Sequence, residues 1–305
     1  MALPPAAEPA AAPAATLHPA GRETRVGSLP EGIVVDPHTG MVAVALRDPA
    51  RLVLISAGSG RVLRTVRILA PPRHLELAGE SGPVLVPAEP VDKMIEVSLP
   101  SATVQSIPVG AHPHDAAAVG GRVFVGNEFG RSVSVLAGRR MVAQIGGFMQ
   151  PGGLAAVGGE VAAVDVRADT VTLIDAHGFR VIGKAPAGKG PTHLVAGDGR
   201  LFVADTRGNA LLGYTTQPEL HLVSRLALAG TPYGIAIDRV HNRLWVTLTA
   251  TNKLVEVAID GPTLSRVASY PTGRQPNTVA VDPRDGRVFV ADAGAGVVQL
   301  IDPRR

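Results

Sequence analysis

Short apolar runs separated by polar corners recur along the chain, and residues 229–260 give the clearest example. This unit contains three apolar runs, 233–237, 244–248 and 254–259, divided by a turn and a polar corner. Runs of this length bounded by Gly, Pro, Asn and Asp indicate strands joined by tight turns. None of them continues with the 3.6-residue period of an amphipathic helix. The unit therefore predicts a meander of antiparallel strands, which cannot bury both of its faces alone.

A corner proline opens each such unit and recurs at intervals of 38 to 44 residues. The seven prolines are Pro30, Pro72, Pro113, Pro151, Pro191, Pro232 and Pro276. A second strand follows in phase, most clearly in RLFVADT (200–206), RLWVTLT (243–249) and RVFVADA (287–293). Several short strands repeated about every 40–45 residues are typical of propeller blades. The sequence therefore predicts an all-β fold, a seven-bladed β-propeller of four-stranded antiparallel blades.

The two ends of the chain predict how this ring closes. The last unit stops after its third strand, VVQLID (297–302), whereas an extra strand-like segment precedes Pro30. Pairing residues 23–29 with residues 297–302 would complete the seventh blade and cover two exposed sheet edges. We therefore expect one propeller domain over residues 22–305.

Composition narrows the classes of function. Apolar residues make up 46% of the 305 residues but aromatic residues only 3%, so Val, Leu, Ile and Ala must fill a large core. The absence of cysteine excludes disulfides and thiolate sites. The chain has no basic run interleaved with aromatics and no apolar run of about 18 residues, so we expect neither nucleic-acid binding nor a membrane span. We also expect a monomer.

Residues 1–21 form a Pro/Ala tract with almost no large apolar side chain. Such a tract cannot bury enough surface to offset its ordering entropy, which predicts disorder. It lacks the basic and apolar regions of a signal peptide. Because tracts of this kind often tether exported domains, we expect an extracytoplasmic location (periplasmic, secreted or cell-surface) with an export signal encoded upstream. A cytoplasmic location is the alternative.

Two units carry a longer pattern, PYGIAIDRVHNRLWV (232–246) and PNTVAVDPRDGRVFV (276–290), and third strands read TVTLID or VVQLID. These units resemble the YVTN (YncE-like) β-propeller repeats, and the resemblance extends over residues 22–305. It implies the architecture shared by lactonase-like propellers and virginiamycin B lyase, in a mostly extracytoplasmic family. The family's Tyr-Val pair is Phe-Val, Trp-Val or Leu-Val here. Since a fold alone does not carry an activity, the function has to be argued from the site.

The corner prolines also predict where a site would lie. The corners and the loops between second and third strands meet at one end of the ring, which we call the channel face. The second residue after the proline is small in ordinary blades, as at Gly32 and Gly234, but it is His74, Asp115 or His193 in blades two, three and five. Exceptions to a repeat at one ring of positions indicate a functional site. The ligand-binding candidates on this ring are His74, His112, Asp115, Asn127, Tyr233 and Asn277.

The densest group of such residues is His112-Pro113-His114-Asp115, together with Glu128 in the next loop. Pro113 favours an extended conformation for His112, which would place His112 and His114 on one side. Two imidazoles and a carboxylate can hold a divalent metal, or form a base with its orienting acid. The metal-ligand candidates are His114, Glu128 and His193, and the catalytic candidates are His114 and His193. The alternative is structural: His112 would be a solvated corner residue, His114 would cap a backbone group of the channel, and His74 and His193 would line the channel bonded to water.

Two classes of function follow from this face. The first is a non-catalytic binding propeller that holds a small molecule or a protein through the channel face. The second is a metal-assisted hydrolase or lyase of the lactonase or virginiamycin B lyase kind, with a divalent cation at the channel mouth that would polarise a carbonyl. The chain contains no HExxH, G-x-S-x-G, P-loop or EF-hand signature.

Overall fold

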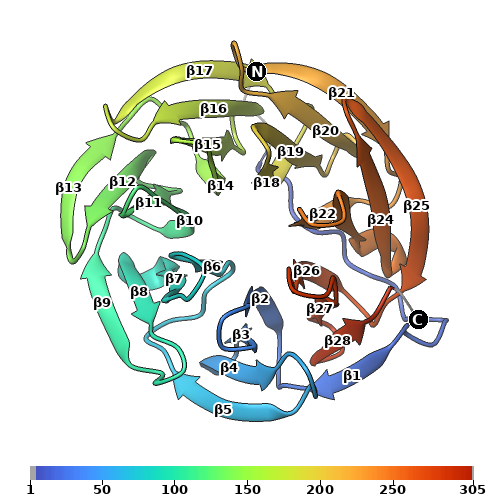
Figure 1. Ribbon diagram of the computed structural model, residues 1–305. Coiled ribbons are helices and arrows are strands. Elements are labelled where there is room, and N and C mark those ends of the chain that lie inside the picture. The colour runs from blue at the N-terminus through green and yellow to red at the C-terminus, as the bar shows by residue number, and fades with distance from the viewer. Residues whose placement is uncertain (1–4, 304–305) are drawn as a thin grey trace.

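The apolar runs pair with their neighbours in the chain to form seven four-stranded antiparallel sheets, arranged as a closed ring (Figure 1). The structure is a computed structural model that describes residues 5–303. The predicted seven-bladed β-propeller is confirmed. Within the described residues, no helix has the length and apolar character needed to cross a membrane.

Each blade runs outward from the channel in chain order. Blade 1 contains β2 (Pro30–Asp36), β3 (Met41–Arg47), β4 (Ala50–Ser56) and β5 (Val62–Arg67). Blade 2 contains β6 (Glu76–Leu77), β7 (Val84–Ala88), the single 3-10 turn η1 (Glu89–Val91), β8 (Lys93–Val97) and β9 (Val104–Pro108). Blade 3 contains β10 (Pro113–Val119), β11 (Arg122–Asn127), β12 (Ser132–Ala137) and β13 (Arg140–Ile145). Blade 4 contains β14 (Pro151–Val157), β15 (Glu160–Asp165), β16 (Thr170–Asp175) and β17 (Arg180–Pro186).

The remaining blades follow the same plan. Blade 5 contains β18 (Pro191–Gly197), β19 (Arg200–Asp205), β20 (Ala210–Thr215) and β21 (His221–Ala227). Blade 6 contains β22 (Pro232–Asp238), β23 (Arg243–Leu248), the 3-10 turn η2 (Thr249–Thr251), β24 (Lys253–Asp260) and β25 (Thr263–Pro271). Blade 7 contains β26 (Pro276–Val281), β27 (Val288–Asp292) and β28 (Val297–Ile301), with β1 (Arg22–Arg25) as its outer strand.

The ring closes as the chain ends predict. Strand β1 pairs antiparallel with β28, from Arg22 opposite Leu300 to Arg25 opposite Val297. The observed pairing is shorter than the predicted one, because the chain leaves the sheet after Arg25 to reach Pro30. In Figure 1 this outer strand lies beside β28, so the first and last parts of the chain complete one sheet together.

The core consists of separate apolar layers between neighbouring blades. The layer between blades 4 and 5, for example, packs Val164 and Leu173 against Leu201 and Leu212. Another joins blades 1 and 7 around Val44 and Phe289 and thereby holds the closure point. Because each blade buries one face against each neighbour, stability depends on the ring as a whole.

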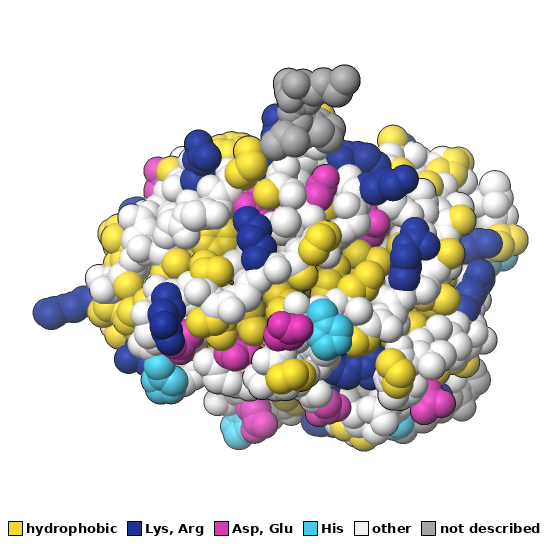
Figure 2. Space-filling view, turned by 90° about the horizontal axis from the view of Figure 1, so that it is seen from above, with side chains coloured by type: hydrophobic (Ala, Val, Ile, Leu, Met, Phe, Trp, Pro, Cys, Tyr) yellow, Lys and Arg dark blue, Asp and Glu magenta, His cyan; other side chains and the backbone are white. Residues whose placement is uncertain are grey.

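The outer strands form the rim and expose large apolar side chains. These side chains are Val62, Leu63, Val104, Met141, Val142, Val181, Ile182, Leu222 and Val267. Figure 2 shows one side of the molecule, where apolar side chains lie in patches among scattered Lys, Arg, Asp and Glu side chains. Scattered charges of both signs are the ordinary pattern of a soluble surface.

The Pro/Ala tract ahead of β1, for which the sequence predicts disorder, has no helix or strand among residues 5–21. Several of its residues nevertheless bond to the propeller. The backbone N–H of Ala20 donates to the carbonyl oxygen of Pro271, and the side-chain amide of Gln299 donates to the carbonyl oxygen of Ala20. Residues 1–4 lie outside the described residues.

Candidate functional site

In every blade except blade 2, a β-bulge at the start of the first strand turns side chains towards the channel mouth. In blade 3, Pro113 pairs with Asn127 but Asp115 pairs with Gly126, so His114 is the extra residue of the bulge. Register shifts follow the corner proline in blades 1, 4, 5, 6 and 7 as well. A bulge bends its strand and re-aims the inserted side chain, which explains why the corner residues meet at one end of the ring.

Blades 2 and 3 bring together Glu89, His112, His114 and Glu128, which we call the acid–histidine cluster. His114 Nδ1 lies 2.7 Å from Glu89 Oε1 and 3.5 Å from Glu128 Oε2. His112 Nδ1 lies 3.2 Å from Glu128 Oε2. Glu89 begins η1, directly after β7, and Glu128 occupies the matching loop after β11. The cluster therefore combines acids from equivalent loops of neighbouring blades with the bulge residue His114 and with His112, which precedes the corner proline.

The charges of this cluster support one another. Burial by itself would lower the pKa of His114, but the bond to Glu89 and the charge of Glu128 outweigh it and raise that pKa. Burial would likewise raise the pKa of Glu89, yet His114 and Arg73 lower it overall. Gln150 Nε2 donates to Glu128 Oε1 at 2.7 Å. The carboxylate of Glu89 and the imidazole of His114 therefore each stabilise the charged form of the other.

The same residues fit a divalent cation. One ligand atom from each of Glu89, His114 and Glu128 lies within 4.8 Å of the others, in the only such group found among residues 5–303. His112 Nδ1 is buried without hydrogen-bond geometry, although a carboxylate oxygen lies 3.2 Å away. A bridging cation would satisfy both atoms. Two imidazoles and two carboxylates are donors of the kind that Zn²⁺ and Mn²⁺ accept.

A second group of aromatic rings continues from this cluster across the channel. His74 stands between His114 and His193, with 4.6 Å between ring centroids on either side, and His74 Nε2 lies 3.3 Å from His193 Nε2. Tyr233 packs edge-on against His193. Burial, with the charge of His114, lowers the pKa of His193 to about 3 and that of His74 well below its usual value. Both rings are therefore neutral at pH 7.

The structure brings most of the predicted site residues to the channel mouth, but with different surroundings. His74, Asp115 and His193 line one channel cavity with Gly32 and Gly234, as the ring argument requires. The carboxylate of Asp115 accepts the N–H of Leu154 and so ties blade 3 to blade 4. Two other candidates form hydrogen bonds within the fold. Asn127 donates to Ser132 and Ser134, and Asn277 donates to Glu31.

One local expectation is wrong. His112 has φ +58°, in the left-handed region, whereas Pro113 was expected to hold it extended. Leu29, Thr231 and Gln275, which also precede corner prolines, share this conformation. The corner therefore imposes it, and His112 and His114 meet Glu128 for a reason other than extended-chain alternation.

Glu89 is absent from the predicted ligands, although the sequence places it in the second loop of blade 2, at the position that Glu128 takes in blade 3. The signal that could have selected it is an acid at the same loop position in two neighbouring blades. The first strand of blade 2 is only two residues long, so the repeat is weak there.

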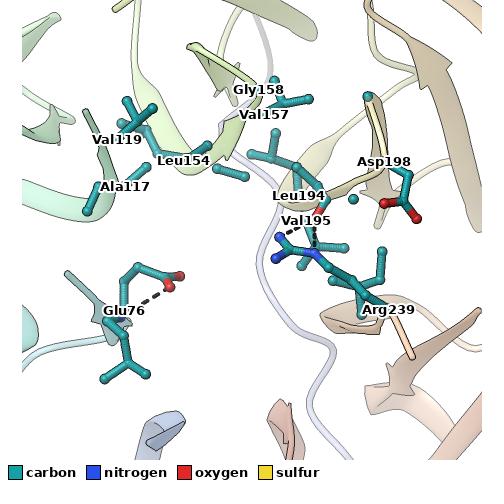
Figure 3. A pocket seen from close by; sticks show the side chains of 18 residues that line it. Glu76, Ala117, Val119, Leu154, Val157, Gly158, Leu194, Val195, Asp198 and Arg239 are labelled. Carbon is teal, nitrogen blue, oxygen red and sulfur yellow. Dashed lines mark hydrogen bonds between the residues drawn. The ribbon is translucent and has the colours of Figure 1, made fainter. Parts of the chain in front are cut away.

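From His74 and His193 the channel continues as open space between the first strands of the blades. Two adjoining cavities, of about 470 and 660 Å³, are lined mainly by aliphatic side chains of the first strands. Figure 3 shows Leu154, Leu194 and Val195 around this space, with Glu76 on one side and Arg239 on the other. The guanidinium of Arg239 donates to the carbonyl oxygen of Ala196.

Glu76 gives a testable pH dependence. Burial and the charge of Asp115 raise its pKa to about 7 from 4.5. An acid whose pKa is higher in the folded state binds more protons there, so stability falls as pH rises from about 4.5 to about 7. At 1.36 kcal/mol per unit the shift corresponds to about 3 kcal/mol. We expect about half of this, because the side chain partly faces the open channel.

Glu76→Gln should therefore be more stable than the wild type by about 1.5 kcal/mol at pH 8 and equal to it at pH 4. Urea unfolding at the two pH values measures the difference. Glu219→Gln on the exposed β20–β21 turn is the control, and it should shift stability equally at both pH values. A constant effect of Glu76→Gln would contradict the raised pKa.

Comparisons with known proteins support the architecture. No family model matches the sequence, and no curated protein matches it. Among solved structures, a streptogramin B lyase superimposes with a TM-score of 0.78 at 15% identity, covering 92% of this chain and 96% of the lyase chain. A virginiamycin B lyase from Staphylococcus aureus gives 0.75 at 14% identity, covering 92% and 99%.

A chain of the mitotic checkpoint complex superimposes with a TM-score of 0.81 at 13% identity, covering 98% of this chain and 97% of that one. Lyases and a member of a protein assembly are thus alike in fold to this chain. At these identities the likeness shows the fold alone. The resemblance to YVTN repeats stays a prediction.

Proposed function

We propose that the protein is a ligand-binding propeller whose channel mouth holds a divalent cation. The observation that carries this proposal is the group formed by Glu89, His114 and Glu128, whose ligand atoms lie within 4.8 Å of one another. His112 lies beside this group, with its Nδ1 3.2 Å from Glu128 Oε2. A cation held by protein ligands from one side can offer its remaining positions to a ligand in the channel mouth. The ligand would then be a small molecule or protein segment that presents a carboxylate or carbonyl oxygen.

Metal analysis tests this proposal. Protein purified without a His tag should bind about one equivalent of Zn²⁺ or Mn²⁺. Because His114→Ala removes a ligand, its affinity should fall at least about 100-fold, beyond the effect of losing an outer partner. His241→Ala is the matched control, since His241 also lies 2.7 Å from a carboxylate, that of Asp238, but outside the channel mouth. Equal affinities of the two variants, or no metal bound by the wild type, would contradict the proposal.

A metal-assisted hydrolase or lyase is the second candidate, and the place of His193 in the ring stack of the channel mouth favours it. Its Nδ1 is buried without a hydrogen-bond partner, so it is available to bond a polar group of a bound substrate. A bound cation would supply polarisation of a carbonyl group. Turnover of simple lactones or of a streptogramin such as quinupristin, lost in His193→Ala with metal binding retained, would support catalysis. Metal binding without turnover leaves the binding function.

The expected extracytoplasmic location also remains a proposal. It is supported by the resemblance to a mostly extracytoplasmic family and by the Pro/Ala tract ahead of the propeller. Fractionation of the native host, followed by immunoblotting, tests it. Recovery of the protein in the cytoplasmic fraction alone would contradict it.

A further inference from the structure

The channel face carries a second recognition surface, which residues 5–13 of the Pro/Ala tract occupy. In Figure 1 the N-terminal segment runs from the side of β25 and β1, past β22, towards β18. Its bonds to the propeller are spread over blades 2, 5, 6 and 7. It therefore lies across the channel mouth.

Side chains of blades 6 and 7 form hydrogen bonds with the backbone of this segment. The side-chain amide of Gln275 donates to the carbonyl oxygen of Ala10 at 2.9 Å and accepts the N–H of Ala12 at 2.8 Å. The N–H of Ala10 donates to Thr249 Oγ1 at 3.0 Å. Gln275 thus bonds the carbonyl oxygen of one residue and the N–H of the next but one, as the backbone of a neighbouring β-strand would.

Two further contacts complete this end of the surface. Asn252 Nδ2 donates to the carbonyl oxygen of Pro13 at 3.0 Å, and Arg274 Nε donates to that of Ala12 at 3.3 Å. Gln275 is itself held in place, because its N–H donates to Asn252 Oδ1 and its amide donates to Asn277 Oδ1. Side chains fixed before binding lose little entropy when they receive a ligand.

The far end of the surface selects small and acidic residues. Arg73 donates to the carboxylate of Glu8 at 2.9 Å, and Arg207 donates to the carbonyl oxygen of Pro5 at 2.8 Å. A Cβ added at Gly190 would come 2.8 Å from the Cβ of Arg207 and 3.0 Å from the Cβ of Ala7, so this glycine lets Arg207 and the segment lie close together. The side chain of Ala12 is buried to 6% exposure.

We propose that Thr249, Asn252, Arg274 and Gln275, with Arg73, form a groove that binds an extended Pro/Ala-rich peptide carrying a carboxylate, and that residues 5–13 are its displaceable resident occupant. Backbone contacts supply the binding, the small residues fit the close approach, and the Glu8–Arg73 pair sets the direction. Prolines suit such a ligand, because they favour an extended chain and have no N–H to satisfy.

The groove deepens the proposed function, since it specifies a peptide as a ligand class for the channel face. Arg73 connects the two sites, with its Nε 4.0 Å from Glu89 Oε1. The peptide contacts themselves require no cation. A negative result in the metal analysis would therefore contradict the cation site alone, and a negative result in the peptide-binding test would contradict the groove alone.

The test uses the full chain and a fluorescent peptide with the sequence of residues 5–15. In the wild type, the amide protons of Ala10 and Ala12 should exchange at least ten-fold more slowly than in a free peptide, and the labelled peptide should bind weakly because the groove is filled. The tail variant Glu8→Arg/Ala12→Pro loses the ion pair and one backbone donor. It should bind the labelled peptide at least ten-fold more tightly than the wild type does.

Adding Gln275→Ala to the tail variant should lower peptide affinity at least ten-fold. Gln144→Ala on β13 is the matched control, because Gln144 also donates a side-chain hydrogen bond but lies on the outer strand. Unprotected amides at Ala10 and Ala12, no peptide binding by the tail variant, or equal affinities with and without Gln275 would each overturn the proposal.

Discussion

Deleting residues 1–29 should lower the melting temperature by about 10 °C and promote aggregation. The deletion removes β1 and leaves β28 as an exposed edge strand, which is a template for pairing with other chains. It also removes Val26, which packs on the layer between blades 1 and 7. If the lost pairing and packing amount to about 5 kcal/mol, a shift of about 2 °C per kcal/mol for a chain of this size gives the expected value.

Deleting residues 1–18 is the control for this experiment. It removes the segment that lies across the channel mouth but keeps Ala20 and its bonds to Pro271 and Gln299. We expect a change of a few degrees at most, because the lost contacts are hydrogen bonds of a half-exposed segment. Thermal unfolding followed by circular dichroism compares the two. Equal melting temperatures would mean that β1 does not hold the ring closed.

The fold could be predicted because each blade is specified locally. Pro232 marks a corner, and the runs after it alternate with turn residues, so seven copies define both the strands and the number of blades. The closure also followed from the sequence, because the last blade is one strand short and a spare strand precedes Pro30. The strands and corners depend on neighbouring residues alone, and the closure follows from counting the strands of each blade.

The ring of candidate residues could be predicted, but its chemistry could not. The corner proline places His74, Asp115 and His193 at one level of the channel. Their partners depend on how bulges turn individual side chains, which no repeat pattern specifies. Asp115 therefore bonds the backbone of blade 4, whereas the neighbouring His114 meets Glu89 across the blade boundary.

Contacts far apart in the chain were the least accessible to sequence reasoning. The bonds of Gln275 to Ala10 and Ala12 join residues more than 260 positions apart. Composition shows that the Pro/Ala tract has almost no large apolar side chain with which to form a core. Hydrogen bonds from the groove to the backbone of the tract hold it in place instead. Amino-acid composition gives no information about such backbone bonds.

Replacing Asp165 by Ala should destabilise the protein by about 3 kcal/mol. The side chain is fully buried at the end of β15 and accepts four backbone N–H groups from the two loops of the channel face. The donors are Met149, Gln150, Arg167 and Ala168. Each bond to a charged acceptor contributes about 1.5–3 kcal/mol, and water entering the vacated space should recover part of the sum.

Asp175→Ala in the same blade is the matched control. Its carboxylate accepts the N–H of His177 in an exposed turn, so we expect a much smaller loss of stability than for Asp165→Ala. Urea unfolding measures both variants. A similar loss in the two would show that the buried network of Asp165 contributes no more than a surface turn.

Asp165→Ala should also weaken cation binding by the acid–histidine cluster. Asp165 holds the backbone of Gln150, whose side chain donates to Glu128 Oε1. Because partners behind a metal ligand typically change affinity by about 10–100-fold, Asp165→Ala should weaken cation binding by about ten-fold, less than the loss in His114→Ala. Metal titration of the folded variant distinguishes this indirect effect from unfolding. Unchanged affinity would separate the loop network that stabilises blade 4 from the geometry of the cation site.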